Sequence, residues 1–146
     1  MSYILDTNCY LRLADRQSPL RNTILNAIRN LRREDQIIFT TPQIIAEFWN
    51  VCTRESSMRG GLELTPKQTE RKIDLMLKHF PILSDSSTTF DIWRLLVSEN
   101  QIVGVGVHDA KLVASMIAHS VQHLVTFNTK DFRRYNMISI VDPRDI

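Results

Sequence analysis

The chain has 146 residues, of which 43% are hydrophobic, and it contains only 4 glycines and 5 prolines. This length and composition predict a single packed domain covering residues 1–146 and exclude a disordered chain. The net charge of +2 is too small to indicate nucleic-acid binding by itself, and no uninterrupted apolar run is long enough to span a bilayer.

The first half of the chain contains two apolar runs typical of strands and two helix-start signals. A serine or threonine followed by proline is a common helix start, because the hydroxyl caps the first turn and proline fits within it. These signals predict, in chain order, a strand at residues 3–5, a helix from Ser18 and Pro19, a strand at residues 36–40 and a helix from Thr41 and Pro42.

The second half begins with a polar segment at residues 54–64, which predicts a loop because it contains two consecutive glycines. A capping-box sequence follows it, and Pro81 places a later strand at a sheet edge. The signals predict a helix from Thr65 to about Lys78, a strand at residues 80–83 and a helix carrying Phe90, Trp93, Leu96 and Val97. After a break at Gly104 and Gly106, they predict a helix starting near Asp109 and a strand at residues 124–126. A helical turn at residues 131–135 and a last strand at residues 137–141 complete the chain order.

Strands and helices alternate along the whole length, which predicts an α/β fold with a parallel sheet and helices on both faces. Ligands of such sheets bind beyond the carboxyl ends of the strands, where the strand order reverses. Asp6 ends the first strand, and Asn128 and Asp131 follow the strand at residues 124–126. If those two strands are neighbours, their loops open onto one crevice.

Asp109 is the most informative single residue, because helical geometry places it on an apolar face. A carboxylate buried without a partner costs several kcal/mol, and the dipole of the first helical turn offsets only about 0.3–1 kcal/mol of that cost. A helix cap is the ordinary interpretation, but the pattern favours a bound cation. The apolar neighbours three, four, seven and eight positions later are Leu112, Val113, Met116 and Ile117.

Three other acids have ordinary interpretations when each is taken alone. Glu47 lies at the rim of an apolar helix stripe, where a surface ion pair is the simpler explanation, and Asp6 and Asp131 are also suitable helix caps. Asn128 is suitable for an Asx-turn. Converging carboxylates without a cation would raise one another's pKa, so a shared site predicts Mg²⁺ or Mn²⁺, which prefer hard oxygen ligands.

The two cysteines, Cys9 and Cys52, lack a zinc-binding spacing, and Asp6 interrupts the N-terminal apolar run too early for an export signal. We therefore expect two free thiols in a reducing, cytoplasmic environment without a membrane partner.

The order of these motifs resembles the PIN-domain ribonucleases, and among them the VapC toxins of prokaryotic toxin–antitoxin pairs. The resemblance covers nearly the entire chain, and its first and last motifs are the more specific ones. Phe127 stands where the family commonly has a polar or basic residue. The motifs are Leu5-Asp6-Thr7-Asn8, Ile45-Ala46-Glu47, Asp109-Ala110 and Thr126-x-Asn128-x-x-Asp131-Phe132.

The resemblance implies a three-layer PIN-like fold whose central parallel sheet has the strand order 3-2-1-4-5. It implies a phosphodiester hydrolase that cleaves RNA as an endoribonuclease with Mg²⁺ or Mn²⁺. It also implies a homodimer and a small antitoxin protein that inhibits it. The implied catalytic positions are the metal-ligating acids Asp6, Glu47, Asp109 and Asp131, with Thr7 and Asn128 as polar support.

Arginine outnumbers lysine by 13 to 5, and six arginines lie between Arg12 and Arg33. Guanidinium matches phosphate geometry, so this stretch suits an RNA substrate, although a solvated helix face explains it equally well. Arg12, Arg133 and Arg134 are candidate phosphate contacts and Tyr135 is a candidate for stacking on a base, although a solvated surface residue is the simpler interpretation of each.

Two other functions remain open at this point. A catalytically inactive PIN-like module would bind RNA or protein through the same groove, although all four acids are present. A phosphotransferase would use Asp6 as a covalent nucleophile, but Asn8 replaces the second acid of the Asp-x-Asp pattern and is unsuited to act as a general acid.

Overall fold

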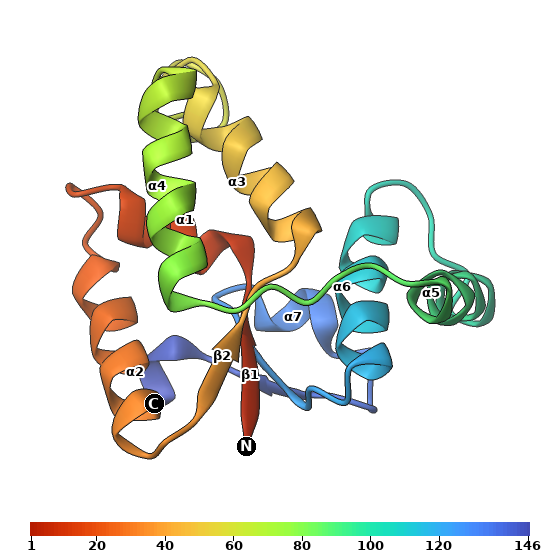
Figure 1. Ribbon diagram of the computed structural model, residues 1–146. Helices are drawn as coiled ribbons and strands as arrows, with labels where there is room; N and C mark the ends of the chain where they lie inside the picture. The colour runs from red at the N-terminus through yellow and green to blue at the C-terminus, as the bar shows by residue number, and fades with distance from the viewer.

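The computed structural model describes residues 1–146 and has one four-stranded parallel sheet in the order β2-β1-β3-β4. Parallel strands place their carboxyl ends at one edge of the sheet, and the chain turns to opposite sides of β1 to form β2 and β3 (Figure 1). The reversal of strand order therefore lies between β1 and β3. The strands are β1 (Ser2–Leu5), β2 (Ile37–Phe39), β3 (His123–Val125) and β4 (Ser139–Val141).

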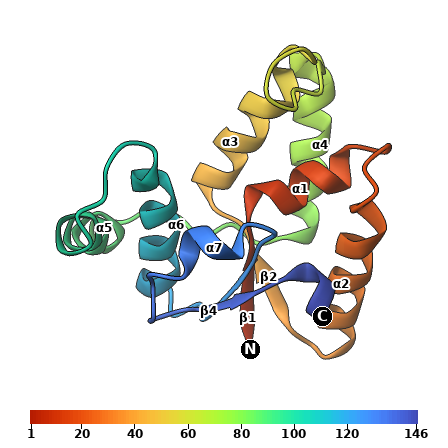
Figure 2. The ribbon, with the colours of Figure 1, turned by 180° about the vertical axis from the view of Figure 1, so that it is seen from behind.

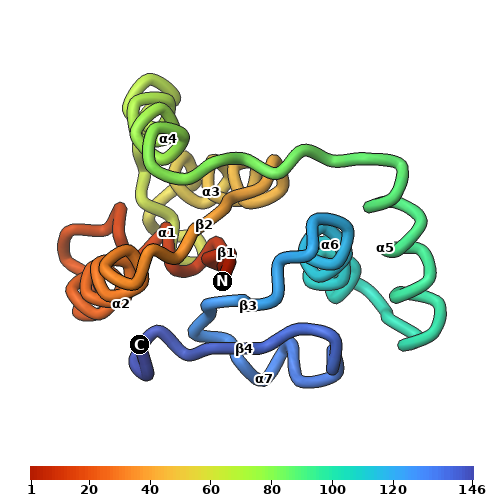
Figure 3. The backbone as a smooth tube through the Cα atoms, turned by 60° about the horizontal axis from the view of Figure 1, so that its bottom comes forward, coloured from red at the N-terminus to blue at the C-terminus, as the bar shows by residue number.

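Helices cover both faces of this sheet and give three layers. Figure 3 shows α2 and α6 on opposite sides of the strands, and Figure 1 and Figure 2 agree with that arrangement. Helix α5 packs on the outer side of α6. The helices are α1 (Thr7–Ala14), α2 (Arg21–Arg33), α3 (Pro42–Thr53), α4 (Pro66–His79), α5 (Ser87–Glu99), α6 (Gly106–Ala118) and α7 (Thr129–Phe132), with a 3₁₀ turn at Pro143–Asp145.

One apolar cluster joins the strands to the helices. Strand β1 contributes three consecutive buried side chains, as expected of a parallel strand covered on both faces. Tyr10 from α1, Phe48 from α3 and Phe132 from α7 are among the largest fully buried side chains. No helix of the structure combines the length and apolar character needed to cross a membrane.

Local capping explains where two of the helices begin. The hydroxyl of Thr41 accepts a hydrogen bond from the Ile44 amide at 3.2 Å, and α3 begins at the following proline. Thr65 and Gln68 form the predicted capping box at the start of α4. Both predictions are confirmed because each depends on residues within a single turn.

The structure corrects the strand expected at residues 80–83. Only one bridge forms there, between Ile82 and Thr40 on the outer side of β2. Pro81 has no amide hydrogen to donate and lies exposed, so the segment makes only two backbone hydrogen bonds to Thr40. The parallel α/β fold is confirmed, and the neighbours of the four strands are as expected, but the sheet has four strands instead of five.

Two helix starts also differ from the prediction. Helix α2 begins at Arg21 because Ser18 first forms a turn, in which its hydroxyl accepts from the Leu20 amide at 3.3 Å. Helix α6 begins at Gly106, so the glycine predicted to interrupt the chain is the first residue of the helix.

Candidate active site

The four predicted acids come from four different helices near the carboxyl edge of the sheet. Asp6 follows β1 directly and is the N-cap of α1. Glu47 lies in the second turn of α3, Asp109 in the first turn of α6, and Asp131 in the short helix α7 that follows β3. The backbone amide of Asp6 donates to the carbonyl of Val125 at 2.9 Å, so the ends of β1 and β3 are tied together at this point.

Asp6 is held by three hydrogen bonds to its two carboxylate oxygens. Oδ1 accepts from the Thr7 amide at 2.7 Å, and Oδ2 accepts from Asn8 Nδ2 at 3.0 Å and from the Thr126 hydroxyl at 2.7 Å. Burial raises the pKa of Asp6 despite these donors, and Glu47 and Asp131 raise it further by charge repulsion. The side chain is therefore rigidly oriented, and its charge is unfavourable without a cation.

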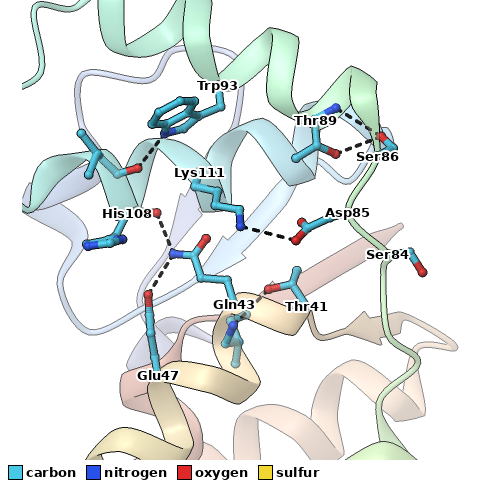
Figure 4. A network of polar contacts seen from close by, with 12 residues as sticks. Thr41, Gln43, Glu47, Ser84, Asp85, Ser86, Thr89, Trp93, His108 and Lys111 are labelled. Atoms are coloured by element: carbon cyan, nitrogen blue, oxygen red, sulfur yellow. Dashed lines mark hydrogen bonds and ion pairs between the residues drawn. The ribbon is translucent and has the colours of Figure 1, made fainter.

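Glu47 also has a donor on each oxygen. The hydroxyl of Thr7 donates to Oε2 at 2.6 Å, and Gln43 Nε2 donates to Oε1 at 2.8 Å. The same Gln43 nitrogen donates to the backbone carbonyl of His108 at 2.8 Å (Figure 4). Glu47 is thereby connected to the residue after Asp6 and to the residue before Asp109.

Asp109 also lies where its charged form is unfavourable. Burial, followed by repulsion from Asp6, Asp131 and Glu47, raises its pKa to about 6. Neither of the two ion pairs in the structure, Lys111–Asp85 and Arg144–Asp142, involves any of the four acids. The fold therefore brings their charges close enough to repel one another and supplies no salt-bridge partner.

The donor set fits a hard divalent cation in kind. No three Asp, Glu, His or Cys side chains form a ready-made metal cage. Mg²⁺ keeps several waters and needs only one or two carboxylates from the protein, so a finished cage is not required. Asp6 and Asp109, whose pKa values are raised by burial and by neighbouring acids, are the residues suited to hold it.

A cavity of about 620 Å³ opens beside Asp109 and Asp131, and neither Asp6 nor Glu47 lines it. Its wall also contains two cations, Lys130 and Arg134, together with Tyr135 and residues 100–103, 105 and 106. A polyanion entering this cavity would meet Asp109 and Asp131 as well as these two basic side chains. Neither Arg12 nor Arg133 lines it, although both are exposed.

Tyr135 and Asn128 were also expected at the site. Tyr135 lines the cavity but is only 2% exposed, so stacking on a base would require the ring to become more accessible. The side chain of Asn128 makes no hydrogen bond to the acids; its backbone amide donates to Thr126 Oγ1 at 3.0 Å. The side chains of Thr126 and Asn8 are the ones that donate to Asp6.

The arginines between residues 12 and 33 lie mainly elsewhere. Arg16, Arg21 and Arg32 line a separate apolar cavity of about 350 Å³ between α1, α2 and α4. Arg32 also lies over the ring of Phe80, with 5.2 Å between its guanidinium carbon and the ring centroid. None of the arginines in this stretch lines the cavity that contains Asp109.

Sequence reasoning missed Gln43 and Lys130 as parts of the site. Gln43 precedes Glu47 by four residues, a spacing that places both on one helix face and was the available signal. Lys130 stands directly before Asp131, and nothing in the local pattern distinguishes it from a solvated lysine.

Comparison with known families gives one match. A model of the PIN domain matches residues 3–137 of the chain. None of the curated proteins compared with the chain matches its sequence.

Several solved structures resemble the fold. VapBC2 from Rickettsia felis, bound to a promoter DNA fragment, aligns with a TM-score of 0.72 at 20% identity over 97% of this chain and 98% of that chain. VapBC-1 from nontypeable Haemophilus influenzae aligns with a TM-score of 0.71 at 17% identity over 98% of each chain. VapC20 from Mycobacterium tuberculosis, described as a sarcin–ricin loop cleaving toxin, aligns with a TM-score of 0.62 at 13% identity over 91% of this chain and 95% of that chain. At these identities the likeness shows the shared fold.

Proposed function

This chain belongs to the PIN domain family, and from that premise we propose that it is an endoribonuclease that hydrolyses RNA phosphodiester bonds with Mg²⁺ or Mn²⁺. The observation that carries the proposal is the unbalanced charge at Asp109, whose pKa is raised by burial and by three other acids. A carboxylate group without a salt-bridge partner at the carboxyl edge of a parallel sheet fits a cation-dependent active site.

The chain's own residues would bind and orient the reactants. A bound divalent ion lowers the pKa of water and neutralises charge on phosphate oxygens. Asp6 and Asp109 would hold the ion, while Thr7 and Gln43 fix the orientation of Glu47 through its two oxygens. Lys130 and Arg134 would bind neighbouring phosphates from the wall of the cavity. In-line attack by water would leave a 5′-phosphate and a 3′-hydroxyl.

The same proposal extends to the biological role, the partners and the cellular environment of the protein. The resemblance to toxin–antitoxin structures supports a toxin role, with a small antitoxin protein as inhibitor and a homodimer as the assembled form. The free, buried thiols of Cys9 and Cys52 suit a reducing cytoplasm. The joined apolar cluster supports a single domain over residues 1–146.

Asp6→Asn and Asp109→Asn test this function. Each substitution keeps the shape of the side chain but removes a charge that would bind the cation, so we expect RNA cleavage to fall by at least about 100-fold. Cleavage is measured on cellular RNA with Mn²⁺ and with chelator, and new 5′ ends are mapped. Asp74→Asn is the control, because Asp74 is an exposed acid on α4.

The inactive-module alternative gives a different result in the same assay. A dead domain would cleave no RNA with either ion, and its thermal stability would not rise when Mg²⁺ or Mn²⁺ is added. Metal-independent cleavage, or near-full activity in either Asn variant, would contradict the assignment of the acids.

A further inference from the structure

The first turn of α6 carries Asp109, but its own sequence secures it weakly. Val105, at the N-cap position, makes no side-chain cap hydrogen bond. Gly104 has a φ of +59°, and the side chains of Val103 and Val105 on either side of it are exposed. A glycine-containing connection without a cap leaves a helix start free to fray, so other parts of the fold must hold this turn in place.

Two side chains from other helices donate hydrogen bonds to this turn. Trp93 Nε1 on α5 donates to the carbonyl of Val107 at 2.9 Å, and Gln43 Nε2 on α3 donates to the carbonyl of His108 at 2.8 Å. Figure 4 shows them reaching the start of α6 from separate helices. The peptide group that Gln43 contacts directly precedes Asp109.

Gln43 makes the only polar link between α3 and α6. Helix α3 packs on α1 and α4, whereas α6 packs on α5. No other hydrogen bond or ion pair joins the two helices. The Gln43 side chain is therefore the one polar group that connects the two helices, and it is suited to set the spacing of the acids that they carry.

The chemistry of the amide suits this role. A primary amide has two N–H donors on one nitrogen, and Gln43 places one on Glu47 Oε1 and the other on the His108 carbonyl, both at 2.8 Å. A glutamate here would lack both donors and would repel Glu47. An alanine would leave Glu47 with the Thr7 hydroxyl alone.

We propose that Gln43 is a positioning residue that fixes Glu47 and the Asp109 turn relative to each other, so that the acids of two separate helices act on one cation. The proposal rests on the proposed metal-dependent function. It assigns to Gln43 no contact with RNA or with the reacting atoms.

Hydrogen–deuterium exchange tests the positioning without any enzymatic activity. We expect Gln43→Ala and Gln43→Met to speed exchange of the amides of residues 107–112 by at least about threefold, because the turn loses one of its two external donors. Gln43→Met keeps the side-chain length and serves if the alanine variant folds poorly. Asn50→Ala is the matched control, since Asn50 is an exposed amide on the same helix.

Mn²⁺ affinity, measured by calorimetry, tests the consequence for the site. We expect Gln43→Met to weaken Mn²⁺ binding by about 10-fold and Gln43→Glu to weaken it in the same direction, with the RNA KM unchanged and kcat reduced. A merely structural residue would shift the melting temperature without changing Mn²⁺ affinity in the folded protein.

The outcomes separate the two proposals. If Gln43→Met exchanges at residues 107–112 like Asn50→Ala, or if it binds Mn²⁺ as tightly as the unaltered protein, the positioning role is overturned. If the unaltered protein fails to bind Mn²⁺ while exchange at residues 107–112 still speeds up in Gln43→Met, the metal-dependent function fails and the structural link stands, without the role toward a cation.

Discussion

Asp109 is held where its charged form is unfavourable, and this has a consequence for stability. In the unfolded chain the carboxyl has an ordinary pKa near 3.8, whereas burial and the neighbouring acids raise the folded pKa to about 6. The folded protein therefore binds this proton more tightly than the unfolded chain does. The resulting stability is present at pH values below about 4 and is lost as the pH rises through about 6.

Asp109→Asn should remove this pH dependence. Without divalent ions, we expect the variant to be more stable than the unaltered protein at pH 7.5 by about 1–2 kcal/mol, because a shift of one pKa unit corresponds to about 1.4 kcal/mol and partial solvent exposure reduces its effect. At pH 4 the two proteins should be nearly equal. Urea denaturation of both proteins at the two pH values, in chelator, measures the difference.

If the unaltered protein were more stable than Asp109→Asn at pH 7.5, the charged form of Asp109 would not destabilise the fold. Saturating Mg²⁺ adds a second check, since a ligand that binds only the folded state stabilises it by mass action. Mg²⁺ should reduce or reverse the stability difference in favour of Asp109→Asn, because that variant has lost a charge that would bind the ion.

At the scale of elements, the connection between α3 and α4 is folded back tightly on the end of α3. The amides of Leu62 and Leu64 donate to the carbonyls of Val51 and Cys52. Gly61 is buried in this connection, where an added Cβ would lie 2.2 Å from the carbonyl oxygen of Glu55. The segment predicted from sequence as a polar loop thus has a closely packed backbone.

Two adjacent glycines make a matched test of this packing. Gly61→Ala forces backbone atoms apart, and we expect it to destabilise the protein by at least about 2 kcal/mol. At Gly60 an added Cβ would have open space, but φ is +72°, so Gly60→Ala should cost only about 1 kcal/mol. Thermal or urea unfolding of both variants gives the order, and an equal or reversed order would show that the connection relaxes easily.

The elements also show which features are readable from sequence. The starts of α3 and α4 were predictable because Thr41 and Thr65 cap turns within three residues of themselves. The same signal at Ser18 was wrong about the helix start, because the hydroxyl is used in a preceding turn. Whether a strand forms around Ile82 depends on pairing with Thr40, which is distant in the chain. The local sequence pattern does not show how long that pairing is.

The site divides along the same line. Asp6 and Asp109 were identifiable as candidates because a strand end and an apolar helix face each give a local physical reason for an unusual carboxylate. The link from Gln43 to His108 joins residues 65 positions apart. No periodicity predicts such a contact, because it depends on how two helices from different layers are placed by the finished fold.

At the scale of the whole molecule, a net charge of +2 gives little general attraction for RNA, so the proposed RNA binding depends on where the cations lie. Most of the arginine-rich stretch near the N-terminus faces another cavity or solvent. Lys130 and Arg134 are the basic side chains that share a cavity with Asp109. In the proposed function, these local cations and a bound divalent ion would offset the repulsion between the acids and phosphate.

Arg134 and Arg133 are neighbours in the chain and allow that distribution to be tested. Both are exposed, but only Arg134 lines the cavity. Each contact with a single-stranded phosphate contributes about 0.7 to the slope of log affinity against log salt. We expect Arg134→Ala to weaken RNA binding and lower the slope by about that amount, while Arg133→Ala changes both by much less. Both variants should keep the Mn²⁺ affinity of the unaltered protein.

Binding of a short single-stranded RNA is measured in the Asp109→Asn background, titrated from low to high salt, because that background avoids cleavage during the measurement. Equal losses in the two variants would mean that RNA is attracted by the general surface charge, and the cavity would then have no special part in binding.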